Sequence, residues 1–412
     1  MIQKPELLAP AGDLEKLKIA VLYGADAVYI GGETYGLRAK AKNFDIETMK
    51  EGIAFAHAHG VKVYVTANIY AHNADFEGMA EYFKQVESIG ADALLISDLG
   101  VFSVAKEAVP NLEIHVSTQA NNTNYKSAQM WYHLGAKRIV VARELSLKEI
   151  KQIRQNIPED MEIEAFVHGA MCISYSGRCL LSNYLSGRDA NKGACAHPCR
   201  WKYHLVEETR PGEYMPIEEN ERGTYIYNSK DLCMLEHIPD LINAGVVSLK
   251  IEGRMKTPFY VGTVIKAYRM AIDDYMESPQ KYQNNIALDM EEVSKASHRD
   301  YTTAFYYGKP DGNQQVYTNN SYIREYDFIG MVKQHSDENY CAVVEQRNKF
   351  SVGETIEVMP AKGESFSMKV GNMWNEQGEK ILSAPHPQQI LKVQFSKPVK
   401  QFDMMRKAVS KS

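Results

Sequence analysis

One pattern recurs through the first two thirds of the chain and constrains its fold more than any other feature. An apolar, β-rich run is followed by a loop, an amphipathic segment and a glycine, and then the next run begins. The junctions read YGADAVYIGG, HGVKVYVTAN, IGADALLISD, LGAKRIVVAR and AGVVSLKIEG. A glycine at this point is typical of a left-handed helix C-cap, and the β-branched run after it is typical of a buried parallel strand.

The pattern predicts eight strands joined by helices. With ELLAPAG, EIHVSTQA and EIEAFVHG added, the expected strands cover residues 6–10, 26–31, 62–67, 93–97, 113–118, 138–143, 162–168 and 246–252. Helices are expected at 13–23, capped by Asp13, and at 46–59, preceded by Asp45. Eight strand–helix units predict a TIM-like (β/α)8 barrel, and a doubly wound open sheet is the alternative.

The spacing of the later strands predicts an insertion and a second domain. About 75 residues separate the seventh strand from the eighth, far more than one crossover helix needs. We therefore expect a barrel over residues 1–280 with a cysteine-rich insertion at about 170–245. After a last barrel helix at about 258–276, the polar stretch ESPQKYQNN is interpreted as a linker or exposed loop, and 281–319 as a connecting segment. Short runs between turn residues predict a small antiparallel β-barrel over 320–412.

Composition places the chain among ordinary globular proteins. It has 412 residues, of which 44% are hydrophobic and 24% charged, and no apolar run approaches the roughly 20 residues of a membrane span. The N-terminus lacks the pattern of a secretory signal, so we expect a cytoplasmic protein without a membrane partner. A net charge of −5 argues against indiscriminate coating of nucleic acid, but it allows a local basic site.

Five of the six cysteines fall inside the expected insertion: Cys172, Cys179, Cys195, Cys199 and Cys233. Clustered cysteines in a reducing compartment are more often metal ligands or redox groups than disulfides. Zinc ribbons favour two close pairs and this chain offers one, whereas iron–sulfur clusters accept irregular spacing. Structural zinc and plain thiols remain the alternatives. The sixth cysteine, Cys341, is interpreted as a small buried hydrophobe.

Polar residues at strand ends supply further candidates. The seventh strand runs directly into Cys172, which predicts that the sulfurs lie at the C-terminal mouth of the barrel, where the chemistry of this fold is found. Other candidates there are Asn68, Ser97, Asp98, Ser117, Gln119, Arg143, Glu144, His168, Lys250, Glu252 and Arg254. Several of these could simply cap the next helix. Lys250 and Glu252 alternate with apolar neighbours, so both are expected to face the barrel interior, where charges need partners or a ligand.

Roles follow from residue chemistry. Arg254 and Arg38 would suit a dicarboxylate, because a guanidinium group binds carboxylate bidentately, and a solvated loop residue is the alternative for Arg38. His168 is a candidate for proton transfer or for supporting a metal site, and a structural histidine is the alternative. We predict catalytic roles for His168, Lys250, Glu252 and Arg254, and substrate-binding roles for Arg38, Asn68, Gln119 and Glu144. Aromatic and basic stretches, DYTTAFYYG, VYTNNSYIREY and EQRNKFSVGETIEV, would suit RNA, although tyrosines also pack β domains.

One long stretch resembles a known signature, that of the collagenase-like peptidase U32 family. The matching residues are Glu164, Phe166, Gly169, Ala170, Met171, Cys172, Gly177, Cys179, Leu181 and Ser182. The likeness continues through GACAHPCRW and SLKIEGRMK, begins at ELLAPAGDLEKLKIAVLYGADAVYIGG, and covers essentially the whole chain. The segment from 320 onward resembles the C-terminal β domain of the family.

The resemblance implies an activity that the residues alone do not. Several U32 members are oxygen-independent hydroxylases, and the closest resemblance is to those that make 5-hydroxyuridine at the tRNA wobble position with prephenate as hydroxyl donor. Relatives hydroxylate a 23S rRNA cytidine or the ubiquinone ring, and the ubiquinone members carry a 4Fe–4S cluster. By this likeness Cys172, Cys179, Cys195 and Cys233 are the cluster ligands, with Cys199 as the alternative to Cys195. Because exposed clusters are often lost in air, zinc is an expected contaminant in aerobic preparations.

The resemblance also leaves other functions and partners open. A U32-type peptidase is one alternative, since His168 or His197 could pair with a cysteine, although HExxH and GxSxG motifs are missing from the sequence. An rRNA cytidine hydroxylase is the other. The expected partners are the tRNA anticodon loop or rRNA and a small dicarboxylate. The sequence does not decide between a paralogous partner subunit and a homodimer.

Overall fold

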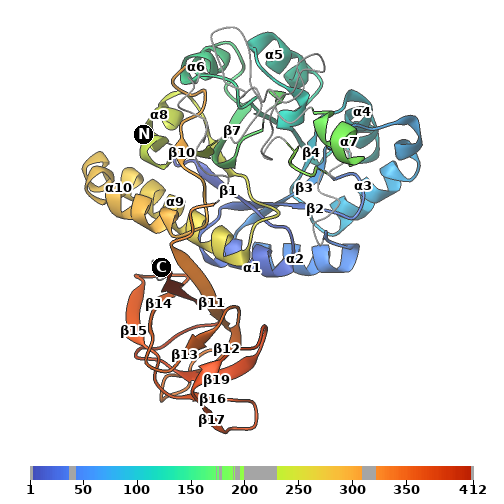
Figure 1. The fold of residues 1–412 in the computed structure, drawn as a ribbon. Coiled ribbons are helices and arrows are strands. Elements are labelled where there is room, and N and C mark those ends of the chain that lie inside the picture. Colours follow the sequence, from blue (N-terminus) through green and yellow to red (C-terminus); the bar gives the residue numbers. More distant parts are fainter. Residues whose placement is uncertain are drawn as a thin grey trace, which may run out of the picture.

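Eight parallel strands close into a barrel in this computed structural model, which describes residues 3–36, 43–172, 174–175, 179–188, 190, 195–198, 230–308 and 322–409 (Figure 1). The strands are β1 (Glu6–Pro10), β2 (Ala27–Gly31), β3 (Lys62–Ala67), β4 (Ala93–Ile96), β5 (Glu113–Val116), β6 (Arg138–Val140), β7 (Glu162–Ala170) and β9 (Ser248–Ile251). Each pairs in parallel with the next, and β9 pairs with both β1 and β7. This closure confirms the predicted barrel and excludes the open sheet.

Helices surround the barrel, and two of them begin where Asp13 and Asp45 predict. They are α1 (Leu14–Leu22), α2 (Ile46–Ala58), α3 (Met79–Ser88), α4 (Leu99–Ala108), α5 (Tyr125–His133), α6 (Leu147–Gln155), α8 (Ile238–Asn243) and α9 (Pro258–Glu277). Asp13 accepts a hydrogen bond from the amide of Lys16 at 2.9 Å, and Asp45 accepts one from Thr48 at 2.8 Å. None of the helices in the described part of the chain combines the length and the apolar character needed to cross a membrane.

A short additional strand returns the insertion to the barrel. β8 (Asp231–Cys233) pairs antiparallel with the end of β7, so that Cys233 lies opposite His168. β10 (Tyr301–Thr302) extends the same ladder on the other side of β8. The sequence pattern did not predict β8, which carries one of the insertion's cysteines.

The stretch ESPQKYQNN forms part of a helix, so its interpretation as a linker or exposed loop is wrong. α10 spans Pro279–Ser294 and packs against α9. Ser278 caps it by accepting a hydrogen bond from the amide of Lys281 at 3.1 Å, and Pro279 occupies the first helical turn. Tyr282 is buried, and its hydroxyl donates to the carbonyl of Leu235 at 2.8 Å. Polar residues on the outer face conceal this helix in the sequence.

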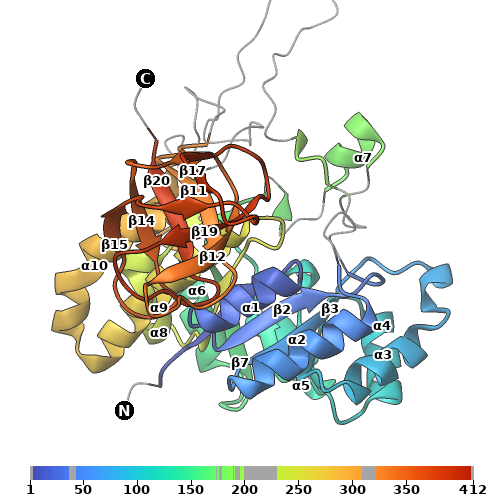
Figure 2. The same ribbon diagram turned by 90° about the horizontal axis from the view of Figure 1, so that it is seen from below.

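The C-terminal domain is a curled, antiparallel half-barrel sheet (Figure 2). Its order is β15 (Phe366–Lys369), β14 (Thr355–Met359), β20 (Met404–Ala408), β11 (Tyr326–Val332), β12 (Cys341–Gln346), β19 (Ile390–Gln394), β16 (Met373–Trp374) and β17 (Lys380–Ile381). A small two-stranded sheet joins β13 (Phe350–Ser351) to β18 (Ser383–Ala384). The sheet encloses its own core of buried apolar residues, so it forms a domain separate from the barrel.

Buried polar contacts attach this domain to the barrel. Arg406 is fully buried, and its guanidinium binds Glu292 of α10 at 2.6 and 2.7 Å and also Glu357 of β14. The hydroxyl of Tyr23, at the end of α1, donates to the carbonyls of Met359 and Phe402, each at 3.0 Å. Because buried charges are costly to separate from their partners, these contacts hold the two domains in one arrangement.

The α9–α10 hairpin contains a carboxyl group whose ionisation opposes folding. Burial raises the pKa of Asp289 from its ordinary value of 3.8 to about 7, and the carboxylates of Asp274 and Glu292 add to the effect. A raised pKa in the folded state means that the stabilising protonated form is lost as the pH rises through about 7. We predict that Asp289→Asn raises the free energy of unfolding by more than about 1 kcal/mol at pH 8, and by much less at pH 4.

Denaturant unfolding at both pH values measures this difference. Glu291→Gln on the same helix is the control, because the Glu291 side chain is 67% exposed. An equal effect of Asp289→Asn at the two pH values would contradict the prediction.

Candidate active site at the barrel mouth

A network of charges fills the lower part of the barrel interior. Glu164 of β7 accepts hydrogen bonds from Lys250 at 2.6 Å, from Arg138 at 3.0 Å and from Ser248 at 3.1 Å. Arg138 also binds Glu6 at 2.6 Å. Two further contacts complete the network. Glu162 binds Arg138 at 2.6 Å, and the hydroxyl of Tyr64 donates to Glu6 at 2.7 Å. The strands β1, β3, β6, β7 and β9 thus share one set of contacts.

This network gives Lys250 a partner inside the protein. Burial alone would raise the pKa of Glu164, but Lys250 and Arg138 outweigh it and lower that pKa to about 2, so Glu164 is ionised. The ammonium group of Lys250 also lies 4.5 Å from the centre of the Tyr29 ring. The expected interior position of Lys250 is observed, and its charge is neutralised there by Glu164.

Arg254 lies buried at the upper end of the barrel, just beyond β9. Its guanidinium donates to the hydroxyl of Thr66 at 3.2 Å and to the side-chain oxygen of Asn43 at 3.0 Å. Gly31, at the end of β2, makes room for it: a Cβ at that position would lie 2.1 Å from Nη2 of Arg254. This close packing fixes a cation at the mouth of the barrel, the end at which a substrate would enter.

A row of amide and hydroxyl groups continues around the same rim. Asn68, after β3, donates to the hydroxyl of Ser117 at 3.2 Å and accepts from Ser97 through its carbonyl at 3.2 Å. Gln119 lies in the short helical turn Thr118–Ala120 after β5, where its carbonyl accepts a hydrogen bond from Tyr70 at 3.0 Å. The predicted substrate-binding residues Asn68 and Gln119 therefore share this rim.

The opposite part of the rim is bridged by an arginine. Arg143, after β6, donates to the carbonyl of Ala170 at 3.1 Å and so connects β6 to the end of β7. The predicted substrate-binding residue Glu144 follows it and is half-buried. Asp98, in contrast, caps α4 by accepting bonds from the amides of Gly100 and Val101, which is the helix-capping alternative.

His168 is enclosed by aromatic side chains. It is buried, and its ring lies 5.5 to 6.0 Å from the rings of Tyr260, Tyr268 and Tyr301. Burial lowers the pKa of His168 to about 3, with His298 and Lys256 adding to the effect, so the imidazole is neutral at physiological pH. The backbone of His168 accepts a bond from the amide of Glu252 at 2.8 Å, which joins two predicted catalytic residues through the main chain.

Cys233 is buried beside the same aromatic group. The Tyr268 hydroxyl lies 3.9 Å from Sγ of Cys233 and 3.5 Å from Nδ1 of His168, and it accepts from the amide of Met234 at 3.1 Å. Burial raises the pKa of the Cys233 thiol to about 12. Cys233 thus packs against Tyr268 at the end of β7.

The other described thiols of the insertion are half-exposed: Cys172, Cys179 and Cys195. The amide of Leu181 donates to Sγ of Cys179 at 3.3 Å, and the amide of His197 donates to Sγ of Cys195 at 3.3 Å. Such N–H···S bonds stabilise thiolate ligands of iron–sulfur clusters. The donor set thus fits an all-thiolate metal group by its chemistry.

The geometry of the described residues does not gather these donors. Within that part of the chain, no three His, Cys, Asp or Glu side chains are placed to hold one metal ion. Cys199 and Arg38, predicted as alternative ligand and as substrate-binding residue, lie outside the described residues. The cluster ligands and the roles of the predicted catalytic residues stay predictions.

Several residues that shape the site were missed by the sequence analysis. Glu164 is the partner of Lys250, Thr66 and Asn43 hold Arg254, and Tyr268 connects His168 to Cys233. Glu164 carried a signal, because it alternates with apolar neighbours in EIEAFV and so had to face the barrel interior. Tyr268 carried no signal in the sequence, because tyrosines are common in apolar helices and nothing marks this one as part of a site.

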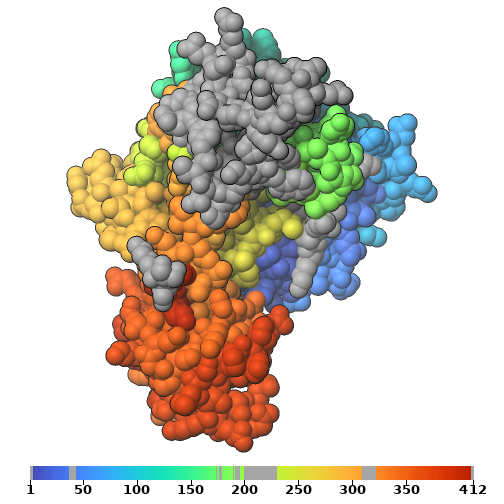
Figure 3. Space-filling model, viewed as in Figure 1, coloured from blue at the N-terminus to red at the C-terminus, as the bar shows by residue number. Residues whose placement is uncertain are grey.

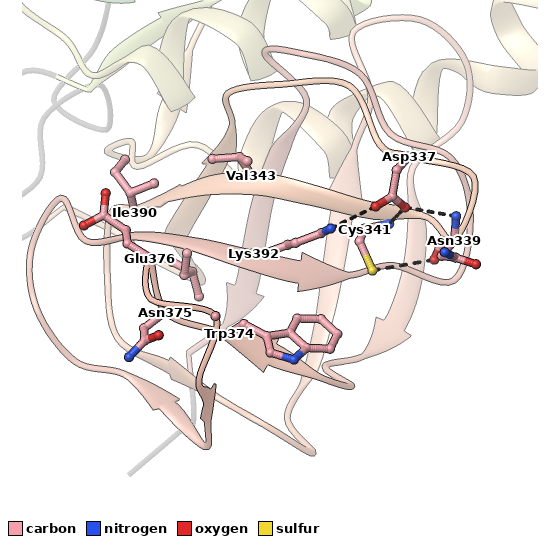
Figure 4. Close-up of a pocket in the computed structure, with 11 residues that line it drawn as sticks. Asp337, Asn339, Cys341, Val343, Trp374, Asn375, Glu376, Ile390 and Lys392 are labelled. Atoms are coloured by element: carbon pink, nitrogen blue, oxygen red, sulfur yellow. Dashed lines mark hydrogen bonds and ion pairs between the residues drawn. The ribbon is translucent and has the colours of Figure 1, made fainter.

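The C-terminal domain has a groove of its own, with a volume of about 570 Å³ (Figure 4). Trp374 and Cys341 line it together with Lys392, which binds Asp337 at 2.9 Å. Cys341 is buried, as predicted. Lys392 is neutralised by Asp337, and Glu376 adds a further carboxylate, so the groove does not suit a phosphate group. Arg347, from the basic stretch proposed for RNA, instead binds Glu15 and Glu345.

Fold and site together define a (β/α)8-barrel protein with a thiol-bearing insertion over the C-terminal ends of its strands. The profile of Peptidase family U32 matches residues 12–316, and that of the Peptidase family U32 C-terminal domain matches residues 324–406. The chain therefore belongs to the peptidase U32 family.

Curated relatives include RNA-modification proteins. A tRNA hydroxylation protein of Bacillus subtilis is 42% identical over 405 residues, which cover 98% of this chain and 95% of the relative. A tRNA hydroxylation protein of Escherichia coli is 38% identical over 422 residues, which cover 93% of this chain and 92% of the relative. A 23S rRNA 5-hydroxycytidine synthase of Escherichia coli is 37% identical over 272 residues, covering 66% of this chain and 40% of the relative. The chain is thus a homologue of tRNA hydroxylation proteins.

The Glu164–Lys250 pair supplies a test of the interior network. We predict that Lys250→Met lowers the free energy of unfolding by about 3–5 kcal/mol, because it leaves the Glu164 charge buried with one cation fewer. The double variant Glu164→Gln/Lys250→Met should recover most of this loss, since it removes both charges. Denaturant unfolding measures both effects.

An exposed ion pair provides the matched control. Lys84 and Glu81 lie 2.8 Å apart on the surface of α3, and Lys84→Met should destabilise the protein far less than Lys250→Met, because an exposed ion pair contributes little to stability. A double variant no more stable than Lys250→Met would show that the pair is not what stabilises this part of the barrel.

Proposed function

We propose that this protein hydroxylates the wobble uridine of tRNA at C5 without molecular oxygen, with prephenate as the hydroxyl donor and a 4Fe–4S cluster as cofactor. The observation that carries the proposal is the likeness to tRNA hydroxylation proteins, which extends over nearly the full length of both chains. A likeness of this extent includes the barrel, the insertion and the C-terminal domain. The proposal therefore concerns the whole chain and not a shared fold alone.

The reaction requires a redox group, and the thiols are the residues best suited to hold one. Replacing the C5 hydrogen by a hydroxyl group is a two-electron oxidation of the base. A 4Fe–4S cluster, when bound, supplies one-electron redox chemistry that side chains do not provide. We assign its ligands as Cys172, Cys179, Cys195 and Cys233, with Cys199 as the alternative fourth ligand.

The donor site is assigned to the cation at the rim. The Arg254 guanidinium is held in place by Thr66 and Asn43 and offers a fork of N–H groups that matches a carboxylate. Arg38 is proposed as the second cation, since prephenate carries two carboxylates. Asn68, Gln119 and Glu144 supply hydrogen-bonding groups along the rim, and the neutral His168 and the backbone of Glu252 hold the end of β7 against β9.

Nucleoside analysis tests the proposed activity. Cells that lack the gene, grown without oxygen to suppress oxygen-dependent hydroxylases, should contain no 5-hydroxyuridine-derived nucleosides in tRNA. A plasmid with the wild-type gene should restore them, whereas Cys179→Ser should not, because the variant lacks a cluster ligand. Mass spectrometry of hydrolysed tRNA and 23S rRNA gives the readout.

The alternatives predict different nucleoside patterns. Loss of 5-hydroxycytidine from 23S rRNA with unchanged tRNA would assign the chain to rRNA hydroxylation. Unchanged nucleosides in both RNAs would contradict a hydroxylase and favour a peptidase.

Metal analysis tests the cofactor separately from the activity. Protein purified without air should contain about four irons and four sulfides per chain. Single changes of Cys172, Cys179, Cys195 or Cys233 to serine should each lower the iron content, because a thiolate ligand is lost. Cys341→Ser is the matched control, since Cys341 is buried in the C-terminal domain.

Two results would revise the assignment. Stoichiometric zinc without iron would overturn the cluster. Loss of iron in Cys199→Ser but not in Cys195→Ser would make Cys199 the fourth ligand in place of Cys195.

A further inference from the structure

Arg143 lies at the mouth of the barrel without an ionic partner. It follows β6 and is half-buried, and within the described residues no carboxylate forms an ion pair with it. Arg138, on β6 itself, binds three carboxylates. A cation that is partly withdrawn from water is stabilised by a counter-ion, so Arg143 is a place at which the mouth can accept an anion.

The guanidinium group of Arg143 is held in place by the barrel wall. Nη1 donates to the carbonyl of Ala170 at 3.1 Å, and the group lies over the ring of Phe166, 5.5 Å from its centre. Nε is shielded from solvent and has no hydrogen-bond partner in the described part of the chain. A buried N–H group without an acceptor costs free energy, and a ligand oxygen at this edge of the guanidinium would remove that cost.

A second cation shares the Phe166 ring, which places Arg143 on the inner side of the mouth. The ammonium group of Lys250, in the barrel interior, lies 5.6 Å from the centre of the same ring. Lys250 is already neutralised by Glu164, at 2.6 Å. Of these two cations, Arg143 is therefore the one that can bind a ligand.

Arg143 also lies where the thiol-bearing insertion begins. Its acceptor Ala170 is the last residue of β7, and Cys172 follows two positions later. Figure 3 shows the molecule from the side of the mouth, where α7 (Leu181–Ser186), in light green, lies at the surface. A ligand bound to Arg143 would therefore lie next to the origin of the insertion.

The strand order places Arg143 and Arg254 on opposite sides of the mouth. Arg143 connects β6 with β7, whereas Arg254 binds Thr66 at the end of β3 and packs on Gly31 at the end of β2. Around the closed barrel, β6 lies opposite β2 and β7 lies opposite β3. A small acid in the mouth thus has a guanidinium group on either side.

We propose that Arg143 binds a carboxylate of the small organic acid that donates the hydroxyl group, through the guanidinium edge that carries Nε. The inference rests on the proposed function and names a further residue of its donor site. A carboxylate accepts about four hydrogen bonds, so Arg143 can share the second carboxylate of the donor with Arg38. The bond to Ala170 holds the guanidinium in advance, which lowers the entropic cost of binding.

The position of Arg143 favours a carboxylate over an RNA phosphate, although both groups suit an arginine. A backbone phosphate is joined to nucleotides on both sides, so it would reach the Phe166 ring only if the RNA chain entered the barrel. A small acid has no such constraint. Binding of an RNA phosphate is therefore an outcome that the experiment must separate.

Donor binding to full-length protein purified without air tests the proposal. We expect Arg143→Met to weaken binding of prephenate, measured by isothermal titration calorimetry, about twentyfold, because charge-assisted hydrogen bonds are lost. Arg143→Lys should weaken it about fivefold, since the charge remains but the fork of donors does not. Lys84→Met on α3 is the matched control: it also removes one positive charge, its side chain is 53% exposed, and prephenate binding should not change.

Three further measurements distinguish ligand binding from a structural role. The thermal midpoint of ligand-free Arg143→Lys should equal that of wild type, because an ammonium group can also donate to the carbonyl of Ala170. Binding of a fluorescently labelled anticodon stem–loop should be the same for wild type and Arg143→Met. In turnover assays Arg143→Lys should raise the KM for prephenate and leave the KM for tRNA unchanged, whereas a residue that only supports the fold would change both.

Each result separates this inference from the proposed function. Equal prephenate binding by wild type and both Arg143 variants, with tRNA hydroxylation intact, would overturn the inference and leave the function standing. Weaker binding of the stem–loop with unchanged prephenate binding would assign Arg143 to an RNA phosphate and also overturn it. A wild-type protein that neither binds prephenate nor hydroxylates tRNA would overturn the proposed function itself, and the inference with it.

Discussion

The ionised carboxylate of Glu164 inside the barrel is the constraint on which the rest of the structure depends. It holds Lys250, Arg138 and Ser248, and through Arg138 it is connected to Glu6. A buried charge without partners would cost several kcal/mol, so the strands that carry these groups must keep their register. The carboxyl ends of the parallel strands then lie at fixed positions along the barrel axis. These positions set where the residues of the mouth lie relative to one another. Arg254 is an example, because it reaches Thr66 only if β9 and β3 end at compatible levels.

β7 transmits this constraint to the thiols. Its lower half carries Glu164, and an irregularity in pairing with β9 falls between Phe166 and His168. Gly169 follows with a φ of 111°, a conformation that glycine adopts without strain, and a Cβ there would lie 2.6 Å from the carbonyl of Glu252. From His168 to Ala170 the strand pairs with β8, and it then leads into Cys172. One strand thus fixes the origin of the insertion, while β8 brings its end back to the barrel.

The sequence predicted the parts of this structure that depend on local chemistry. Five of the eight barrel strands follow from the glycine-then-strand pattern and three from other apolar runs, and Asp13 and Asp45 begin their helices because a carboxylate next to backbone amides acts locally. Long-range partners were not predictable. Alternation indicates that Lys250 and Glu164 both face the barrel interior, but nothing in the sequence pairs the one with the other. β8 has three residues, too few to show a period, and the polar outer face of α10 hid a helix whose buried side is defined by its contacts with α9 and Leu235.

The attachment of the C-terminal domain limits how it can contribute to function. Arg406 is buried between Glu292 of the barrel's hairpin and Glu357 of the sheet, so moving the domain would expose or separate three charges. Such a separation costs more than a weakly bound ligand can repay. The domain therefore acts as a fixed extension of the barrel and not as a lid. In Figure 2 the strands β17 and β20 stand on the same side of the barrel as α7. A large substrate that approaches the mouth from that side meets a surface whose shape is already set, and binding energy is not spent on ordering the two domains.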